Sequence, residues 1–265
     1  MSKPTIEISV QMFEFQKRFW WMLSSIDQQK EYLGNIIPDI KITVSTMSSI
    51  DRFKDLTYKM INTFKHLSIT IKDYKKASVF GNRGLTRNLD IKETKADWLF
   101  FTDADMIFHP HFFSDMSANY LDQWKGTGKL ITAARINIPV DVSYKLIDSL
   151  DYNSKPVSNV FNKCWDVKMG YSCHGRAPGA GYFQLIEADY LKKNNINYCN
   201  KIHDRTLFSP RGNKFRSDKV FRGKLNGTII MKKPKDELGS RDILKPLLHL
   251  NHWRKSNPEW IDKGQ

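Results

Sequence analysis

Short apolar runs alternate with longer segments of helical spacing through the first half of the chain. The short runs predict strands at 6–10, 40–44, 67–71, 98–101 and 130–134. The longer segments predict helices at 13–31, 51–64, 85–95 and 110–124, the second of which has Asp51 as its N-cap. Strands that alternate with helices favour an α/β fold with a doubly wound, mostly parallel sheet flanked by helices.

The pattern is less regular in the second half. Residues 140–175 show few clear periods, which indicates an insertion or acceptor-side loops. Further on, the sequence predicts a strand at 182–186 with a short helix through 190, a helix at 218–225 that Ser217 starts, and a strand at 228–231. Because there is no internal repeat and no low-complexity linker, we expect a single domain over residues 1–265.

Composition is typical of a folded protein, and we expect this one to work in the cytoplasm. The 265 residues are 40% hydrophobic and 12% aromatic, enough to form a sizeable core. No apolar stretch approaches the roughly 18 residues of a spanning helix, and the N-terminus lacks a signal-peptide pattern. The three cysteines Cys164, Cys173 and Cys199 form no even disulfide set. They lie near two histidines without CxxC-type spacing, so they are either ordinary thiols or ligands of a zinc site.

The chain is strongly basic, with 42 Lys and Arg against 28 Asp and Glu, a net charge of +14. Eight basic residues gather between positions 201 and 224, where only Asp204 and Asp218 oppose them. The cluster is either a solvated surface or a face that binds a polyanion: nucleic acid, a membrane surface or an acidic sugar.

The pair Asp103 and Asp105 directly follows the apolar run Trp98–Phe101. In a mostly parallel sheet, ligands bind beyond the carboxyl ends of the strands, which is where this pair would lie. Two carboxylates at a strand end suit Mn²⁺ or Mg²⁺, hard cations that prefer oxygen ligands and keep positions open for substrate phosphates. The alternative is a capping turn.

The segments Arg83–Ile91 and Ala96–Asp105 resemble glycosyltransferase family 2 and its GT-A relatives, in which an Arg-Asn pair on a helix precedes an apolar strand and the Asp-x-Asp motif. The resemblance implies a GT-A fold. Residues 1–105 would then form the nucleotide-sugar-binding half, and residues 106–265 the acceptor-binding half.

The same resemblance implies roles for further residues. Asp218 matches the second member of an acidic pair that serves as the base in inverting enzymes, although Ser217 replaces the first member. The alternative for Asp218 is a carboxylate near the positive end of a helix dipole. His249, in preference to His252, would complete the metal shell. Acceptor-side residues would be Gly179, Gly181, His252 and Trp253.

Arg83 and Arg87 have three possible roles under this resemblance. They would bind the donor's diphosphate, pair with aspartates of the base site, or simply cover a helix face.

These residues predict a metal-dependent glycosyltransferase that moves a sugar from a nucleotide sugar, UDP by family analogy, to an acceptor hydroxyl. The charge and the absence of an anchor pattern resemble phage enzymes that glycosylate hydroxymethylated cytosine in DNA, with Arg211, Lys214 and Arg216 as phosphate contacts. The alternative acceptor is a cell-envelope glycan or lipid-linked saccharide. A second alternative is a non-catalytic, basic nucleic-acid-binding protein on a GT-A core.

Overall fold

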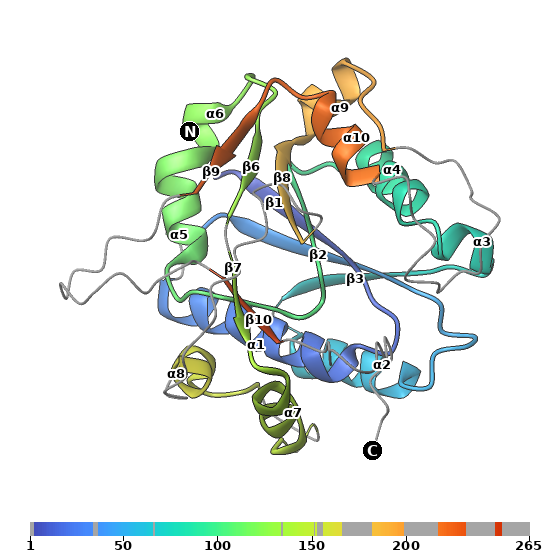
Figure 1. Cartoon of the computed structure of the whole chain (residues 1–265), viewed down its shortest axis with the longest axis vertical. Helices are drawn as coiled ribbons and strands as arrows, with labels where there is room; N and C mark the ends of the chain where they lie inside the picture. Colours follow the sequence, from blue (N-terminus) through green and yellow to red (C-terminus); the bar gives the residue numbers. More distant parts are fainter. Residues whose placement is uncertain are drawn as a thin grey trace.

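A mostly parallel sheet forms the centre of the computed structural model, which describes residues 3–33, 37–65, 67–133, 135–150, 152, 156–165, 182–198, 217–231 and 247–250. Within these ranges seven strands run in the order β3-β2-β1-β4-β8-β6-β9 (Figure 1). Their bounds are β1 Thr5–Gln11, β2 Asp39–Thr46, β3 Ser68–Asp73, β4 Trp98–Thr102, β6 Leu130–Thr132, β8 Phe183–Glu187 and β9 Thr228–Ile230. Only β8 is antiparallel to its neighbours in this sheet.

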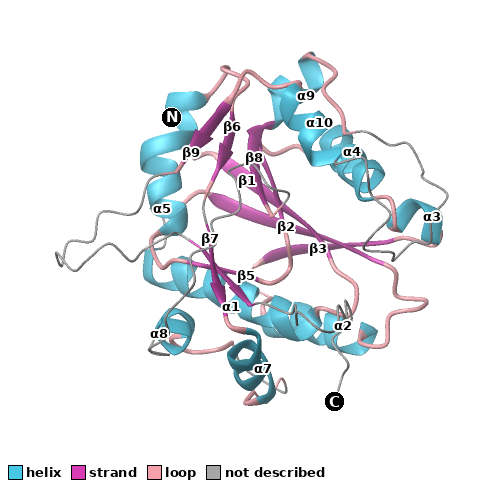
Figure 2. Cartoon of the chain, viewed as in Figure 1, coloured by secondary structure: helices cyan, strands magenta, loops and turns pink. Residues whose placement is uncertain are grey.

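Helices cover both faces of the sheet (Figure 2). They are α1 Gln16–Leu33, α2 Lys54–Thr63, α3 Ala77–Phe80, α4 Arg83–Glu93, α5 Phe112–Met116, a π-helical turn Ser117–Leu121, α6 Asp122–Trp124, α7 Val140–Asp148, α8 Val160–Trp165, α9 Ala188–Lys193 and α10 Ser217–Gly223. Successive side chains of a strand point to opposite faces. In β4, Trp98 and Phe100 therefore pack in the core that includes α1, whereas Leu99 and Phe101 pack in the core that includes α4, α9 and α10.

A second, small sheet adjoins the first at its carboxyl edge. It consists of β5 Met106–Phe108, β10 Leu247–Leu250 and β7 Arg135–Ile138, with β10 in the middle. Because β5 begins directly after Asp105, this sheet brings a segment near the end of the chain beside the Asp-x-Asp motif. The backbone N–H of Leu250 donates to the carbonyl of Asp105 at 3.0 Å, which fixes the contact.

The structure confirms the α/β fold class and each predicted strand, with ends that differ by at most two residues. It corrects two other expectations. Residues 140–175 include the helices α7 and α8. Asp51 is not the N-cap of α2, which begins at Lys54 after Phe53; its carboxylate accepts hydrogen bonds from the Phe53 N–H at 2.8 Å and from Gln16 at 2.7 Å.

Both corrections have physical causes. Helix α7 contains the β-branched residues Val140, Val142 and Ile147, which lower helix propensity, so burial rather than local preference stabilises it. Asp51 is buried between α1 and α2. There the side-chain amide of Gln16 donates to one of its oxygens and competes with the backbone N–H groups that an N-cap would accept from. No helix in the described ranges has the length and apolar character to cross a membrane.

Candidate active site

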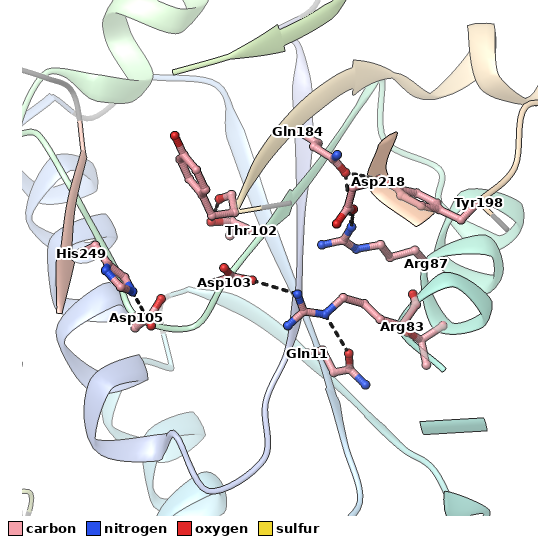
Figure 3. A network of polar contacts seen from close by, with 12 residues as sticks. Gln11, Arg83, Arg87, Thr102, Asp103, Asp105, Gln184, Tyr198, Asp218 and His249 are labelled. Atoms are coloured by element: carbon pink, nitrogen blue, oxygen red, sulfur yellow. Dashed lines mark hydrogen bonds and ion pairs between the residues drawn. The ribbon is translucent and has the colours of Figure 1, made fainter. Parts of the chain in front are cut away.

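The Asp-x-Asp motif lies in the link between the two sheets. Asp103 follows the last residue of β4, and its Oδ1 lies 3.4 Å from a terminal nitrogen of Arg83 on α4. Arg83 in turn donates from Nε to the side-chain oxygen of Gln11 at the end of β1, at 3.3 Å (Figure 3). The Asp103 Oδ1 atom is buried and accepts no hydrogen bond within the described part of the chain. It is thus an acceptor with capacity left for a ligand.

Asp105 faces the small sheet instead. Its Oδ2 lies 2.9 Å from Nε2 of His249 on β10 (Figure 3). Nδ1 of that ring lies 2.9 Å from the side-chain oxygen of Asn137 on β7. An amide oxygen only accepts, so Nδ1 carries a hydrogen and the neutral ring has its lone pair on Nε2. Nε2 and the carboxylate are then two electron-pair donors that face one another. A proton or a cation must join them.

Asp218, the predicted base, pairs with an arginine of α4. Arg87 is 5% exposed and donates to Asp218 at the start of α10 and, at 3.3 Å, to Gln184 on β8. The centre of its guanidinium lies 5.2 Å from the Phe101 ring and 5.1 Å from the Tyr198 ring. Burial alone would lower the pKa of Arg87, but the neighbouring Tyr198 and Asp218 raise it above its usual value. Arg87 is therefore a permanent cation beside the predicted base.

Tyr198 connects β8 with α10 beside this ion pair. Its phenol donates to Gln184, and its ring stacks on Phe221 of α10 with centroids 3.9 Å apart and planes 5° from parallel. Asn88, the second residue of the Arg-Asn pair, bonds both the backbone N–H and the carbonyl of Tyr198, at 2.7 and 3.1 Å. Burial raises the pKa of the Tyr198 phenol, which keeps it neutral. The Arg-Asn pair thus positions α10 and its carboxylate.

A small polar cleft opens at the carboxyl ends of β1, β2 and β4, next to the start of α4. Its walls are formed by side chains that include Ser9, Gln11, Ser45, Arg83, Arg87 and Thr102. At its base Asp90 accepts from Ser9 at 2.6 Å and from Lys72 at 2.6 Å. Burial raises the pKa of Asp90. The position matches the edge at which α/β sheets bind ligands, and the lining offers hydroxyl, amide and guanidinium groups.

The structure brings the predicted residues together in a different way from the expected one. The two aspartates were expected to lie together at one cation; in the structure Asp103 lies beside Arg83 and Asp105 beside His249, so each also has a protein partner of its own. Among the described residues no three His, Cys, Asp or Glu side chains form a cluster that could hold a metal ion. Asp105 and His249 fit together as two ligands because their lone pairs face one another, and Oδ1 of Asp103 is a further buried oxygen of the motif with capacity for a ligand.

Several predicted residues lie outside the described ranges: Gly179, Gly181, His252, Trp253, Arg211, Lys214, Arg216, Cys173 and Cys199. Cys164 is a buried thiol on α8, and burial raises its pKa. Sequence reasoning missed Asn137, Gln184 and Tyr198. The alternation of polar Arg135 and Asn137 with Ile136 and Ile138 was a usable signal, because it marks a strand with one polar face.

Comparisons with known proteins support the fold. Neither a protein-family model nor a curated protein matches the chain. Among solved structures, residues 1–349 of TarS from S. aureus match 92% of this chain with a TM-score of 0.55 at 15% identity. The mannosyltransferase PcManGT from Pyrobaculum calidifontis, in complex with GDP-Man and Mn²⁺, matches 89% at 11% identity with a TM-score of 0.46. The bifunctional glycosyltransferase WbbM matches 74% at 10% identity with a TM-score of 0.41.

Of these three, only the TarS fragment exceeds a TM-score of 0.5, so it alone bears on the fold. The chain spans 60% of the length of that fragment. The likeness shows the fold that the two chains share: a mixed α/β domain whose mostly parallel sheet is flanked by helices. Activity and substrates are a separate question, because a fold hosts many functions.

Proposed function

We propose that this chain is a glycosyltransferase that moves a sugar from a nucleotide diphosphate sugar to an acceptor hydroxyl. The observation that supports this best is the meeting of three acidic residues with three cationic or imidazole partners at one edge of the sheet (Figure 3). The pairs are Asp103 with Arg83, Asp105 with His249 and Asp218 with Arg87. Both Asp103 and Asp218 influence the pKa of Arg87, so the motif and the base lie close to the same cation.

In this proposal the polar cleft binds the nucleoside, UDP by family analogy, with Arg83 at the diphosphate. Arg83 is half exposed and bonds only weakly to Asp103 at 3.4 Å, so a diphosphate can take its place at the guanidinium. Asp105 and His249, with Asp103, would hold a Mn²⁺ or Mg²⁺ ion, which when bound supplies positive charge to the leaving diphosphate.

Asp218 acts as the base in this proposal. It takes the proton of the acceptor hydroxyl as that oxygen forms a bond to the anomeric carbon. The bond from the anomeric carbon to the diphosphate oxygen breaks, and the diphosphate leaves with the electron pair, so the configuration inverts. Arg87 holds Asp218 through a buried ion pair, and Tyr198 fixes the helix that carries it. These contacts set the direction of the carboxylate.

For the acceptor we propose hydroxymethylated cytosine in DNA, with a cell-envelope saccharide as the alternative. The support is the net charge of +14 and the basic run that ends in α10, the helix of Asp218. A base within duplex DNA must be reached in the groove or flipped out. Mass analysis of hydroxymethylated DNA, after incubation with metal and a panel of nucleotide sugars, tests this acceptor. Modification of a saccharide while the DNA stays unmodified would replace it.

A thermal-shift screen tests the donor site. We expect one nucleoside diphosphate to raise the melting temperature only when Mn²⁺ is present, because the ion and the diphosphate bind together. A non-catalytic nucleic-acid-binding protein would instead be stabilised by DNA and by no nucleotide. Lys3→Gln provides a control, since Lys3 pairs with Asp39 at the amino ends of β1 and β2, the edge of the sheet opposite the Asp-x-Asp motif.

A further inference from the structure

Arg135 is the first residue of β7 and a buried cation, with 7% of its surface exposed. Its described contact is with an aromatic ring: the centre of the guanidinium lies 4.3 Å from the Tyr182 ring. Its Nε is buried and makes no hydrogen bond, and no described carboxylate forms an ion pair with it. Within the described part of the chain, Arg135 is thus a desolvated guanidinium without an anion beside it.

The other two buried arginines of the described ranges each have a carboxylate nearby. Arg87 pairs with Asp218, and Arg18 has Asp105 as an electrostatic neighbour and donates to the Leu250 carbonyl at 3.3 Å. A buried guanidinium loses much hydration free energy, and the face of an aromatic ring offsets only part of that loss. The missing stabilisation must come from elsewhere, and a bound anion is the simplest source.

The position of Arg135 indicates which anion. Side chains alternate along a strand, so Arg135 lies on the same face of β7 as Asn137, which contacts His249 and, through it, Asp105. On its other side is Tyr182, whose carbonyl accepts from Thr102 at 2.9 Å, directly before Asp103. Arg135 therefore lies between two series of contacts. One leads through Asn137 and His249 to Asp105, and the other leads through Tyr182 and Thr102 to the residue before Asp103.

We infer that Arg135 binds a phosphate oxygen of the donor's diphosphate. The planar guanidinium offers parallel N–H donors that match the oxygens of a phosphate, and Tyr182 holds the plane in one orientation. The inference rests on the proposed function, because it takes the diphosphate to lie at Asp103 and Asp105. It adds a binding residue from the small sheet, on the opposite side of the motif from Arg83.

The test compares Arg135→Met with the wild type in two measurements, the affinity for inorganic pyrophosphate in the presence of Mn²⁺ and the melting temperature without ligand. Methionine keeps most of the apolar volume and removes the charge. We expect pyrophosphate to bind about tenfold more weakly or worse, as after the loss of a charge-assisted hydrogen bond. We expect the melting temperature of the ligand-free protein to stay equal or rise, because an uncompensated buried charge is gone.

Lys129→Met is the matched control. Lys129 also places its cation on a ring, that of Trp124, at 4.5 Å. It precedes β6, and because β6 and β4 are both antiparallel to β8, it lies at the opposite edge of the sheet from Asp103. We expect unchanged pyrophosphate affinity in this variant. If Arg135→Met does not fold, Arg135→Lys decides: it keeps the charge and loses the planar fork, so we expect several-fold weaker pyrophosphate binding.

Two results would overturn the inference: wild-type pyrophosphate affinity in Arg135→Met or Arg135→Lys, or no pyrophosphate binding by the wild-type protein. A lower melting temperature with unchanged affinity would make Arg135 a structural partner of Tyr182.

Sugar transfer by the wild type separates the two proposals. Pyrophosphate binding that depends on Arg135, without any transfer, would contradict the proposed function alone. Transfer together with wild-type affinity in the variants would contradict the Arg135 inference alone.

Discussion

At the scale of single residues, the site is a set of charges that compensate one another. Asp103 and Asp218 each face an arginine of α4, and Asp105 faces His249 of β10. Such an arrangement stabilises the folded protein without ligand and leaves defined positions for a cation and a diphosphate. The two aspartates of the motif have separate partners, so their roles can be separated by substitution.

We predict that Asp103→Asn and Asp105→Asn each lower sugar transfer by orders of magnitude while the fold persists. The change removes the negative charge at nearly constant volume, and with it the attraction for the cation that compensates the diphosphate. Transfer rates at saturating Mn²⁺, together with circular dichroism, measure the effect. Wild-type rates in either variant would remove that aspartate from the site.

Asn137 is predicted to act through His249. Its side-chain oxygen fixes the hydrogen on Nδ1 and so directs the Nε2 lone pair toward Asp105. Removal of such a partner typically weakens metal affinity by about 10–100-fold. We expect Asn137→Ala to weaken Mn²⁺ binding to that extent in a calorimetric titration. Asn119→Ala, on an exposed helical turn, is the control; equal Mn²⁺ affinity in both variants would contradict the orienting role.

At the scale of elements, turns and loops hold the sheet in register with its helices. The turn before β6 shows how tight these contacts are. Gly128 has a positive φ of 68°, and a Cβ atom built there would lie 2.1 Å from a ring atom of Tyr190 on α9. Gly126 has a similar φ of 74° but open space around the same position.

These two glycines give a matched pair of substitutions. Gly126→Ala is expected to cost about 1–2 kcal/mol, the strain of a left-handed conformation for a residue with a Cβ. Gly128→Ala carries the same strain and in addition must displace the Tyr190 ring, for a further cost of about 1–3 kcal/mol. Chemical denaturation of both variants measures the difference. Equal free energies of unfolding for the two variants would show that the Tyr190 ring moves aside without a loss of stability.

The loops after β2 and β3 are joined by Asp73, whose carboxylate accepts from Lys75 and from the N–H and hydroxyl of Ser48 at 2.8 and 2.7 Å. The Lys75 contact first, and then Ser48, lower the pKa of Asp73 to about 2. A folded-state pKa below the unfolded value stabilises the protein above the unfolded pKa, and the contribution is lost as the pH falls toward the folded one. We therefore expect the stability that depends on Asp73 to disappear between about pH 4 and pH 2.

Denaturant titrations across this pH range test the contribution. Asp73→Asn should be less stable than the wild type at pH 7 and should approach it near pH 2. A Ser48→Ala substitution should cost less in the Asp73→Asn background than in the wild type, because the two residues share their hydrogen bonds. A constant difference between the two proteins from pH 7 to pH 2 would contradict the assignment.

At the scale of the whole molecule, charge is the most unusual property, with 14 more basic than acidic residues. If the basic run contacts DNA, Arg211, Lys214 and Arg216 replaced together by Gln should weaken DNA binding. The slope of log affinity against log salt should flatten by roughly 2.7, at about 0.9 for each lost phosphate contact. Nucleotide binding should remain, because the cleft is built from β1, β2, β4 and α4. An unchanged slope would favour a saccharide acceptor.

Much of this molecule follows from local sequence. The alternation of apolar runs and amphipathic segments predicted the strands from β1 to β4 and the helices α1, α2 and α4 between them, because neighbouring residues decide periodicity and turns. The Asp-x-Asp motif was visible for the same reason, because it is a short pattern at the end of a predicted strand. The Arg-Asn pair, inside a predicted helix, was indicated by resemblance to a family. His249 and Asp218 were indicated by the same resemblance, which also offered Arg83 and Arg87 as partners of the base-site aspartates; the structure pairs Arg87 with Asp218.

Tertiary structure decided the rest. His249 lies beside Asp105 because the three- and four-residue strands β5 and β10 pair, across 144 residues of sequence. Arg87 meets Asp218 across 131 residues, and Arg135 meets Tyr182 when β7 joins the small sheet. Strands this short have no reliable period, and their pairing depends on which apolar faces pack together once the main sheet has formed. The residues of the site could be named from sequence, but their partners were determined by packing.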